Sequence, residues 1–249
     1  MDEHYPHFFA RFYDLLYAGI LSDGTNYYIR KILEAKGPVL EAGVGTGRIF
    51  IEALAKGADI YGIDISGPML DILRSKMDSK DHSRISLRDI RDFKADRKFK
   101  LVISPFRVFM HMNTIEDQLS ALDNVYESLE EGGSFIFDVF VPNPSYLANG
   151  IQDMVDFEGE YKPGEKLRRI TSADYNLIDQ MICLDMRFEW KENGRLLSET
   201  WKSTMRFFFR YELELLLGRS KFRKWEIFGG FNECLLAKDS KEFVIVCRK

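Results

Sequence analysis

Short apolar runs alternate with amphipathic stretches over residues 1–142. Apolar residues recur at helical spacing through residues 5–35, and Gly37-Pro38 ends that pattern. Strands are expected next at 39–42, 59–65, 85–89, 101–104 and 134–141, and helices between them at 48–55, 67–77 and 115–129. Strands that alternate with helices in this order are typical of parallel βαβ units, so these strands are predicted to share one doubly wound sheet.

The hydrophobic period changes to two beyond Pro142. Residues 165–209 are predicted to form antiparallel strands, and Asn193-Gly194 is a typical hairpin turn. A helix at 212–217 and strands at 224–228 and 243–247 follow. The expected fold is α/β, with a doubly wound, mostly parallel seven-stranded sheet and a small antiparallel β insert. Residues 1–142 and 211–249 would form the ligand-binding α/β domain, and residues 143–210 would form an insert that covers substrate or makes a dimer contact.

Composition narrows the class of protein. The 249 residues suffice for one large α/β domain with an insertion, and 20 Phe and 11 Tyr favour an aromatic-lined cavity besides the core. A formal net charge of −4 does not suggest a general nucleic-acid surface. Three widely spaced cysteines argue against a disulfide framework and a zinc motif, so no metal is expected. The polar start and the lack of a long apolar run predict a cytoplasmic protein without a membrane span.

The segment Val39–Gly47 carries the most chemical information in the chain. It reads as a buried strand followed by Gly43, Gly45 and Gly47, with a helix starting near Arg48. Glycines let the backbone turn sharply and approach a ligand closely, and a helix start offers unpaired N–H groups and a partial positive charge. Such a turn after the first strand of an open α/β sheet is typical of a nucleotide-like ligand site, although tight strand–helix packing alone also accounts for it.

Three further polar features end the next strands. Asp64 ends the second strand, where a carboxylate can accept hydrogen bonds from both ribose hydroxyls. Asp89-Ile90 ends the third strand, where the carboxylate can take an adenine amino proton while the isoleucine packs on the ring. Ser104-Pro105 ends the fourth strand. Asp64 could instead begin a helix, Asp89 could pair with an arginine, and Ser104 could simply end a strand.

These four features together resemble the class I S-adenosylmethionine-dependent methyltransferases. The first motif of that family is an acidic residue followed by Gly-x-Gly-x-Gly, which Glu41, Gly43, Gly45 and Gly47 match. Nicotinamide enzymes use Gly-x-Gly-x-x-Gly, and here the third position falls on Arg48. The resemblance implies a Rossmann-like methyltransferase fold with S-adenosyl-L-methionine as cofactor.

The resemblance also implies roles for single residues. Asp64 would hold the ribose, and Asp89 with Ile90 would frame the adenine. The N-terminal helix, which carries Tyr13, would fold over the cofactor as it does in relatives. The expected cofactor-binding set is Tyr13, Glu41, Gly43, Gly45, Gly47, Asp64, Ile65, Met69, Asp89, Ile90, Ser104 and Pro105. The insert at 165–209 is similar to the extra sheet of a subgroup that includes glycine/sarcosine and amino-sugar N-methyltransferases.

Methyl transfer from a sulfonium is an in-line displacement that needs mainly positioning of the acceptor atom. His111 and Tyr13 are the candidate catalytic residues, because a histidine can accept a proton near neutrality and Tyr13 can touch the cofactor or polarise the substrate. Structural roles for both remain open. Arg107 could receive a substrate carboxylate or phosphate, or could be a surface arginine.

The leading hypothesis is transfer of a methyl group to N or O of a small molecule, by direct displacement without a metal. The alternatives are an RNA or protein methyltransferase, a cofactor-binding protein without turnover, and a nicotinamide oxidoreductase. The basic and aromatic stretch at 218–225 is interpreted as a solvated turn rather than an RNA site. The expected partners are therefore a small-molecule methyl acceptor but no nucleic acid and no membrane, and the chain is expected to be a monomer or homodimer.

Overall fold

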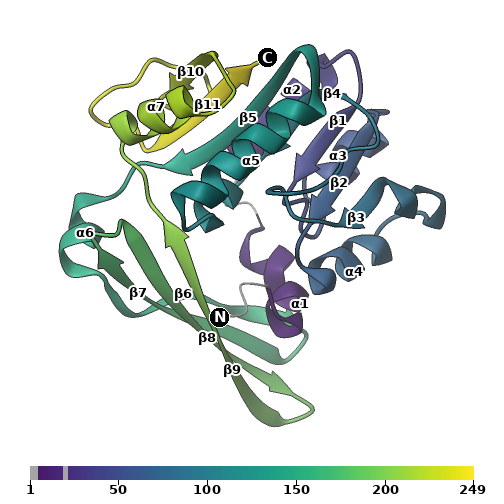
Figure 1. Cartoon of the computed structure of the whole chain (residues 1–249). Coiled ribbons are helices and arrows are strands. Elements are labelled where there is room, and N and C mark those ends of the chain that lie inside the picture. The colour runs from purple at the N-terminus through teal and green to yellow at the C-terminus, as the bar shows by residue number, and fades with distance from the viewer. Residues whose placement is uncertain (1–4, 19–21) are drawn as a thin grey trace.

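The computed structural model describes residues 5–18 and 22–249, which form two β-sheets and the helices that pack on them (Figure 1). The larger sheet has seven strands in the order β10-β11-β5-β4-β1-β2-β3. Its strands are β1 (Val39–Ala42), β2 (Ile60–Asp64), β3 (Ile85–Leu87), β4 (Phe99–Ser104), β5 (Leu129–Phe140), β10 (Lys224–Phe228) and β11 (Glu242–Arg248). Strands β1 to β5 pair in parallel, whereas β11 is antiparallel to both β5 and β10. The predicted mostly parallel seven-stranded sheet is confirmed.

Side chains on the two faces of this sheet enter different cores. Along β4, Val102 packs in one core, whereas Leu101 and Ile103 pack in the other. The first core is completed by α5 (Ile115–Ser128) and α7 (Arg210–Arg219). The second core is completed by α2 (Ser22–Glu34), α3 (Phe50–Ala55) and α4 (Gly67–Ser75). Because both faces are covered, the strands are apolar on both sides, which is why the sequence shows them as continuous apolar runs.

The smaller sheet has four antiparallel strands in the order β6-β7-β8-β9. They are β6 (Ile151–Lys162), β7 (Glu165–Asn176), β8 (Met181–Glu192) and β9 (Arg195–Arg206), and α6 (Pro144–Asn149) precedes them. Asn193 and Gly194 both have positive φ at the β8–β9 turn, as the hairpin prediction requires. The sequence prediction missed β6, because most of its side chains are exposed and it lacks a clear apolar alternation.

The helix α1 (His7–Leu16) lies between the two sheets (Figure 1). Its Phe9 ring lies 4.6 Å from the ring of Trp201 on β9. On its other side, Asp14 accepts a hydrogen bond from the Thr46 hydroxyl at 2.7 Å, in the turn after β1. The predicted helical stretch at 5–35 is therefore two helices, α1 and α2, and residues 19–21 of that prediction lie outside the described residues. Helix α1 covers the space above the carboxyl ends of the parallel strands.

Several boundaries differ from the prediction. The helix expected from Arg48 begins at Phe50, the strand expected to reach Asp89 ends at Leu87, and the strand expected from residue 134 already begins at Leu129. Asp89 therefore lies in the turn beyond β3 rather than on the strand. Two 3₁₀ segments complete the fold, η1 (Ser79–Arg84) and η2 (Val108–His111). Within residues 5–18 and 22–249, we find no helix of the length and apolarity that crossing a membrane would need.

Candidate functional site

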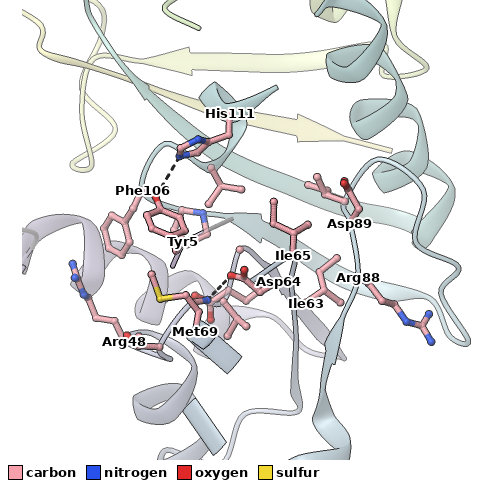
Figure 2. Close-up of a pocket in the computed structure, with 18 of the residues that line it drawn as sticks. Tyr5, Arg48, Ile63, Asp64, Ile65, Met69, Arg88, Asp89, Phe106 and His111 are labelled. Carbon is pink, nitrogen blue, oxygen red and sulfur yellow. Dashed lines mark hydrogen bonds between the residues drawn. The ribbon is translucent and has the colours of Figure 1, made fainter. Parts of the chain in front are cut away.

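A pocket opens at the carboxyl ends of β1, β2 and β4, and Tyr5 and Tyr13 from the N-terminal segment line it beside residues of these strand ends (Figure 2). Most of the predicted site residues line it: Tyr13, Glu41, Gly43, Gly45, Asp64, Ile65, Met69, Asp89, Ile90, Pro105 and His111. Gly47 and Ser104 do not. The Ser104 side chain is fully buried, and a Cβ on Gly47 would lie 2.3 Å from Leu73, so that glycine serves helix packing. The structure thus brings together residues from five separate segments of the chain.

The glycine turn leaves open space for a ligand at one position. Gly45 has φ of +54°, and a Cβ built there would meet no atom within 4 Å. At Gly43, by contrast, a Cβ would lie 2.3 Å from Val108 of the opposite wall. Gly43 therefore permits the two walls to approach each other, whereas Gly45 exposes backbone to the pocket.

Asp64 is held in one orientation by the backbone around it. Its Oδ2 accepts the N–H of Gly45 at 2.8 Å (Figure 2). Its Oδ1 accepts the N–H of Ser66 at 2.8 Å. Ser66 caps α4 with its own side chain, so the alternative of Asp64 as the helix cap does not apply. Each carboxylate oxygen can accept more than one hydrogen bond, so Asp64 has the acceptor capacity that a ribose diol would use.

Asp89 is paired with Arg91, as one of its sequence interpretations proposed. The Arg91 Nε donates to both carboxylate oxygens at 3.0 Å, and Nη2 donates to Oδ2 at 2.6 Å. Arg91 also donates to Asp117 on α5 at 3.0 Å. The arginine thereby fixes the turn beyond β3, and Ile90 lies beside it on the pocket wall. Pairing orients the carboxylate without removing it from the pocket.

Two polar side chains in the pocket have atoms without hydrogen-bond partners among the described residues. Glu41 on β1 is only 2 % exposed, and its Oε2 is buried without a partner. Burial, with the nearby charge of Asp64, raises the pKa of Glu41 well above its ordinary value, whereas Arg48 opposes that rise. The neutral form of the Glu41 carboxyl is thereby favoured. Both Nη atoms of Arg48 are likewise buried without a partner. Buried polar groups without partners are costly, so this arrangement is suited to a ligand that brings an anionic group to Arg48 and a polar group to Glu41.

Aromatic rings surround the Arg48 guanidinium. Its central carbon lies 5.6 Å from the ring centroid of Tyr13, 5.7 Å from that of Tyr17 and 5.2 Å from that of Phe106. We call these three rings and Arg48 the arginine cage. Arg48 was not predicted as a site residue. Its position directly after the last glycine of the turn was the signal available in the sequence.

His111 and Tyr5 form the other end of the pocket. The Tyr5 hydroxyl lies 3.4 Å from Nε2 of His111 (Figure 2), and the Tyr5 ring lies 4.5 Å from the ring of Trp201 on β9. Burial lowers the pKa of His111 to about 4, so the imidazole is neutral near pH 7. Burial also raises the pKa of both Tyr5 and Tyr13. This end therefore offers neutral hydrogen-bonding groups and aromatic surface.

Arg107 does not present its guanidinium as a free receptor for a substrate anion. It forms an ion pair with Glu242, and its Nη1 lies 3.6 Å from Oδ2 of Asp138. The surface alternative is also wrong, because the side chain is only 21 % exposed. Among the described residues, no group of three or more His, Cys, Asp or Glu side chains is placed to hold a metal ion.

Comparison with known proteins agrees with this geometry. Residues 39–133 match the family described as "Methyltransferase domain". YqeM of Bacillus subtilis, whose name describes it as a methyltransferase, is 30 % identical over 132 residues, which cover 53 % of each chain. The dTDP-3-amino-3,4,6-trideoxy-alpha-D-glucopyranose N,N-dimethyltransferase of Streptomyces venezuelae is 28 % identical over 138 residues, or 52 % of this chain and 56 % of the relative. The chain thus spans about half the length of the curated relatives it matches.

Solved structures share the fold over nearly the whole chain. An S-adenosylmethionine-dependent methyltransferase from Clostridium acetobutylicum superposes with a TM-score of 0.76 at 18 % identity, covering 95 % of both chains. The sugar N-methyltransferase KedS8 from Streptoalloteichus superposes with a TM-score of 0.75 at 16 % identity, covering 95 % of this chain and 93 % of that one. At these identities the likeness establishes the arrangement of both sheets.

Proposed function

Residues 39–133 match a methyltransferase domain family, and the fold is shared with a solved S-adenosylmethionine-dependent methyltransferase; we propose that this chain is an S-adenosyl-L-methionine-dependent methyltransferase. It transfers a methyl group to N or O of a small molecule by direct displacement. The observation that carries the proposal is that Arg48 and Glu41, whose side chains have buried atoms without partners, lie in one pocket with the pre-oriented Asp64.

The residues present fit this cofactor. Asp64 would accept the ribose hydroxyls, and the turn at Asp89 and Ile90 would receive the adenine. Arg48 would bind the carboxylate of the amino-acid end, since a guanidinium favours carboxylates, and the Glu41 carboxyl lines the same pocket as a hydrogen-bonding group. Bound S-adenosyl-L-methionine supplies a methyl group on a positively charged sulfur, which needs no metal activation.

The end of the pocket at His111 and Tyr5 would receive the methyl acceptor. The neutral imidazole can accept a hydrogen bond from an amine or hydroxyl and so direct its lone pair toward the methyl group. Tyr13 belongs to the arginine cage, and its ring centroid also lies 6.1 Å from that of Tyr5 at the acceptor end, so it would contact the cofactor. We assign the insert, residues 143–210, as the cover of the acceptor site, because Trp201 on β9 packs against Tyr5.

An amine nitrogen of a small sugar is the acceptor we favour. The relative from Streptomyces venezuelae and the neighbour KedS8 are named as amino-sugar and sugar N-methyltransferases. The pocket supports an uncharged amine at this end, because His111 stays neutral and presents an acceptor nitrogen. A panel of amino sugars and of matched hydroxy sugars, assayed with labelled cofactor, separates N from O transfer.

Calorimetric titration of S-adenosyl-L-homocysteine tests the cofactor assignment. We expect micromolar binding by the wild type, about −8 kcal/mol, and a loss of about 10- to 100-fold in Arg48→Met, since hydrogen bonds to charged groups contribute about 1.5–3 kcal/mol. Arg88→Met is the matched control. Arg88 borders the same pocket, but its guanidinium points away from it (Figure 2) and donates to the carbonyl of Lys94.

The alternatives give different results in the same experiment. Binding of a reduced nicotinamide nucleotide in preference to S-adenosyl-L-homocysteine would indicate an oxidoreductase. Cofactor binding without methyl transfer to any amine or hydroxyl acceptor would indicate a binding protein without turnover. Transfer to RNA or protein, but to no small molecule, would retain the reaction and replace the substrate class.

A further inference from the structure

Two consecutive residues beyond β4 have a left-handed backbone. Phe106 has φ of 56° and Arg107 has φ of 69°, and neither is glycine. Such a conformation costs about 1–2 kcal/mol per residue and persists only where the surrounding structure holds it. The Arg107 carbonyl then accepts the N–H of Met110 at 2.9 Å, which begins η2 and places His111. This turn therefore determines where one whole wall of the pocket lies.

Asp138 on β5 contacts both residues of this turn. Its side chain is fully buried, and its Oδ1 accepts the N–H of Phe106 at 2.8 Å and the hydroxyl of Tyr28 at 2.6 Å. Its Oδ2 lies 3.6 Å from Nη1 of Arg107. One carboxylate thus contacts both strained residues and ties them to α2, which carries Tyr28.

Arg107 extends the same network from β5 to the adjacent strand β11. Its guanidinium lies between Asp138 on β5 and Glu242 on the neighbouring strand β11. Burial raises the pKa of both carboxyls, that of Glu242 to about 7, while Arg107 opposes the rise in each. Removing two carboxyls and an arginine from water costs free energy, and well-packed apolar residues often stabilise a strand end at least as well. A role in holding the turn accounts for them better.

We propose that Asp138 is a positioning residue of the methyl-transfer site. By holding the Phe106–Arg107 turn, it keeps the Phe106 ring against Arg48 and directs η2 so that His111 faces the pocket. The inference rests on the proposed function for the identity of the ligand in the pocket. The role of Asp138 in holding the Phe106–Arg107 turn does not depend on that identity. Asp138 touches neither cofactor nor acceptor; it acts through Phe106 and His111.

Hydrogen exchange and calorimetry on Asp138→Asn test the proposal. In the ligand-free variant, amides of residues 105–112 should exchange at least tenfold faster than in the wild type, and affinity for S-adenosyl-L-homocysteine should fall about tenfold. Tyr28→Phe removes one hydrogen bond from the same carboxylate and should shift both quantities in the same direction by less. If Asp138→Asn does not fold, Tyr28→Phe alone provides the same test of exchange and affinity.

Glu214→Gln is the matched control. Glu214 on α7 accepts the indole N–H of Trp225 at 2.7 Å, away from the pocket. This change should lower the melting temperature without altering exchange at 105–112 or ligand affinity.

Two outcomes would contradict the positioning role of Asp138, and a third would contradict the proposed function. If Asp138→Asn and Tyr28→Phe lower the melting temperature but leave exchange at 105–112 as in the wild type, Asp138 does not hold the turn. If exchange increases but affinity is unchanged, the turn does not position the site. If the wild type binds no S-adenosyl-L-homocysteine, the proposed function fails, while the exchange comparison still decides whether Asp138 holds the turn.

Discussion

At the scale of single residues, the pocket combines groups that are already held in place with groups that lack partners. Asp64 and Asp89 are fixed by hydrogen bonds from the protein itself. Arg48 and Glu41 are buried but have atoms without partners among the described residues. The groups that are already held in place reduce the entropy lost on binding. The groups that lack partners gain hydrogen bonds when a ligand binds, which contributes favourable free energy.

Substitution of Gly45 should separate ligand affinity from stability. In Gly45→Ala the left-handed backbone costs about 1–2 kcal/mol, and the new methyl group occupies the open space where a ligand would approach. We expect affinity for S-adenosyl-L-homocysteine to fall at least tenfold in calorimetry, with only a modest decrease in melting temperature. Equal affinity in both proteins would show that no ligand approaches the backbone there.

The depressed pKa of His111 predicts a dependence of stability on pH. A histidine whose pKa is about 4 when folded and about 6.5 when unfolded binds fewer protons in the folded state between those values. Stability from this group is therefore complete above pH 6.5 and is lost as the pH falls toward 4. Because the ring lines an open pocket, we expect a loss of about 1–2 kcal/mol rather than the full value. The free energy of unfolding of the wild type minus that of His111→Gln, measured by denaturant titration from pH 7 to 4, should show this decrease.

At the scale of elements, α1 joins the glycine turn to the insert sheet. Phe9 is fully buried between Trp201 and Phe188, while Tyr5 and Tyr13 lie on the pocket. Pro6 at the start of the helix makes no side-chain cap. The helix is held by aromatic packing of Phe9 against the insert and by the hydrogen bond from Thr46 to Asp14.

Truncation of Phe9 should weaken binding as well as stability. Phe9→Ala leaves a cavity and should cost about 3–5 kcal/mol, and looser docking of α1 should reduce affinity for S-adenosyl-L-homocysteine severalfold. Phe222→Ala removes an equally buried ring that packs on Tyr126, in the core formed with α5 and α7. That control should lose similar stability but keep wild-type affinity. Equal affinities in the two variants would contradict the covering role of α1.

At the scale of the whole molecule, the insert sheet packs on the rest of the chain through two cores. One contains α1 and Met69 of α4, and the other contains Ile182 of the insert together with Phe137 of β5. We therefore expect one cooperative thermal transition. Ligand at 100 times its Kd stabilises the folded state by about 2.7 kcal/mol. For a chain of this size that corresponds to a rise in Tm of about 5–10 °C. Scanning calorimetry with S-adenosyl-L-homocysteine measures it. Two transitions, only one of which responds to ligand, would show that the insert unfolds independently.

The sequence by itself determined the parallel sheet, the hairpin at Asn193 and the position of Asp64 at the end of its strand. These features depend on local periodicity and on the backbone freedom of glycine, which neighbouring residues encode. It did not reveal β6, because exposed residues on one strand leave no apolar alternation to detect. For Asp89 it left two interpretations open, and the structure pairs that residue with Arg91.

Only the tertiary structure decided which charges find partners. Arg107 and Arg48 look alike in the sequence, yet Arg107 meets Glu242 from 135 residues away, whereas the Arg48 Nη atoms lie among aromatic rings without a hydrogen-bond partner among the described residues. Tyr28 reaches Asp138 across 110 residues, and Tyr5 reaches His111 across 106. Pairing at such separations depends on how strands and helices are ordered in space, and spacing along the chain contains no direct measure of it. The groups that these pairings leave unsatisfied are the ones that identify the site.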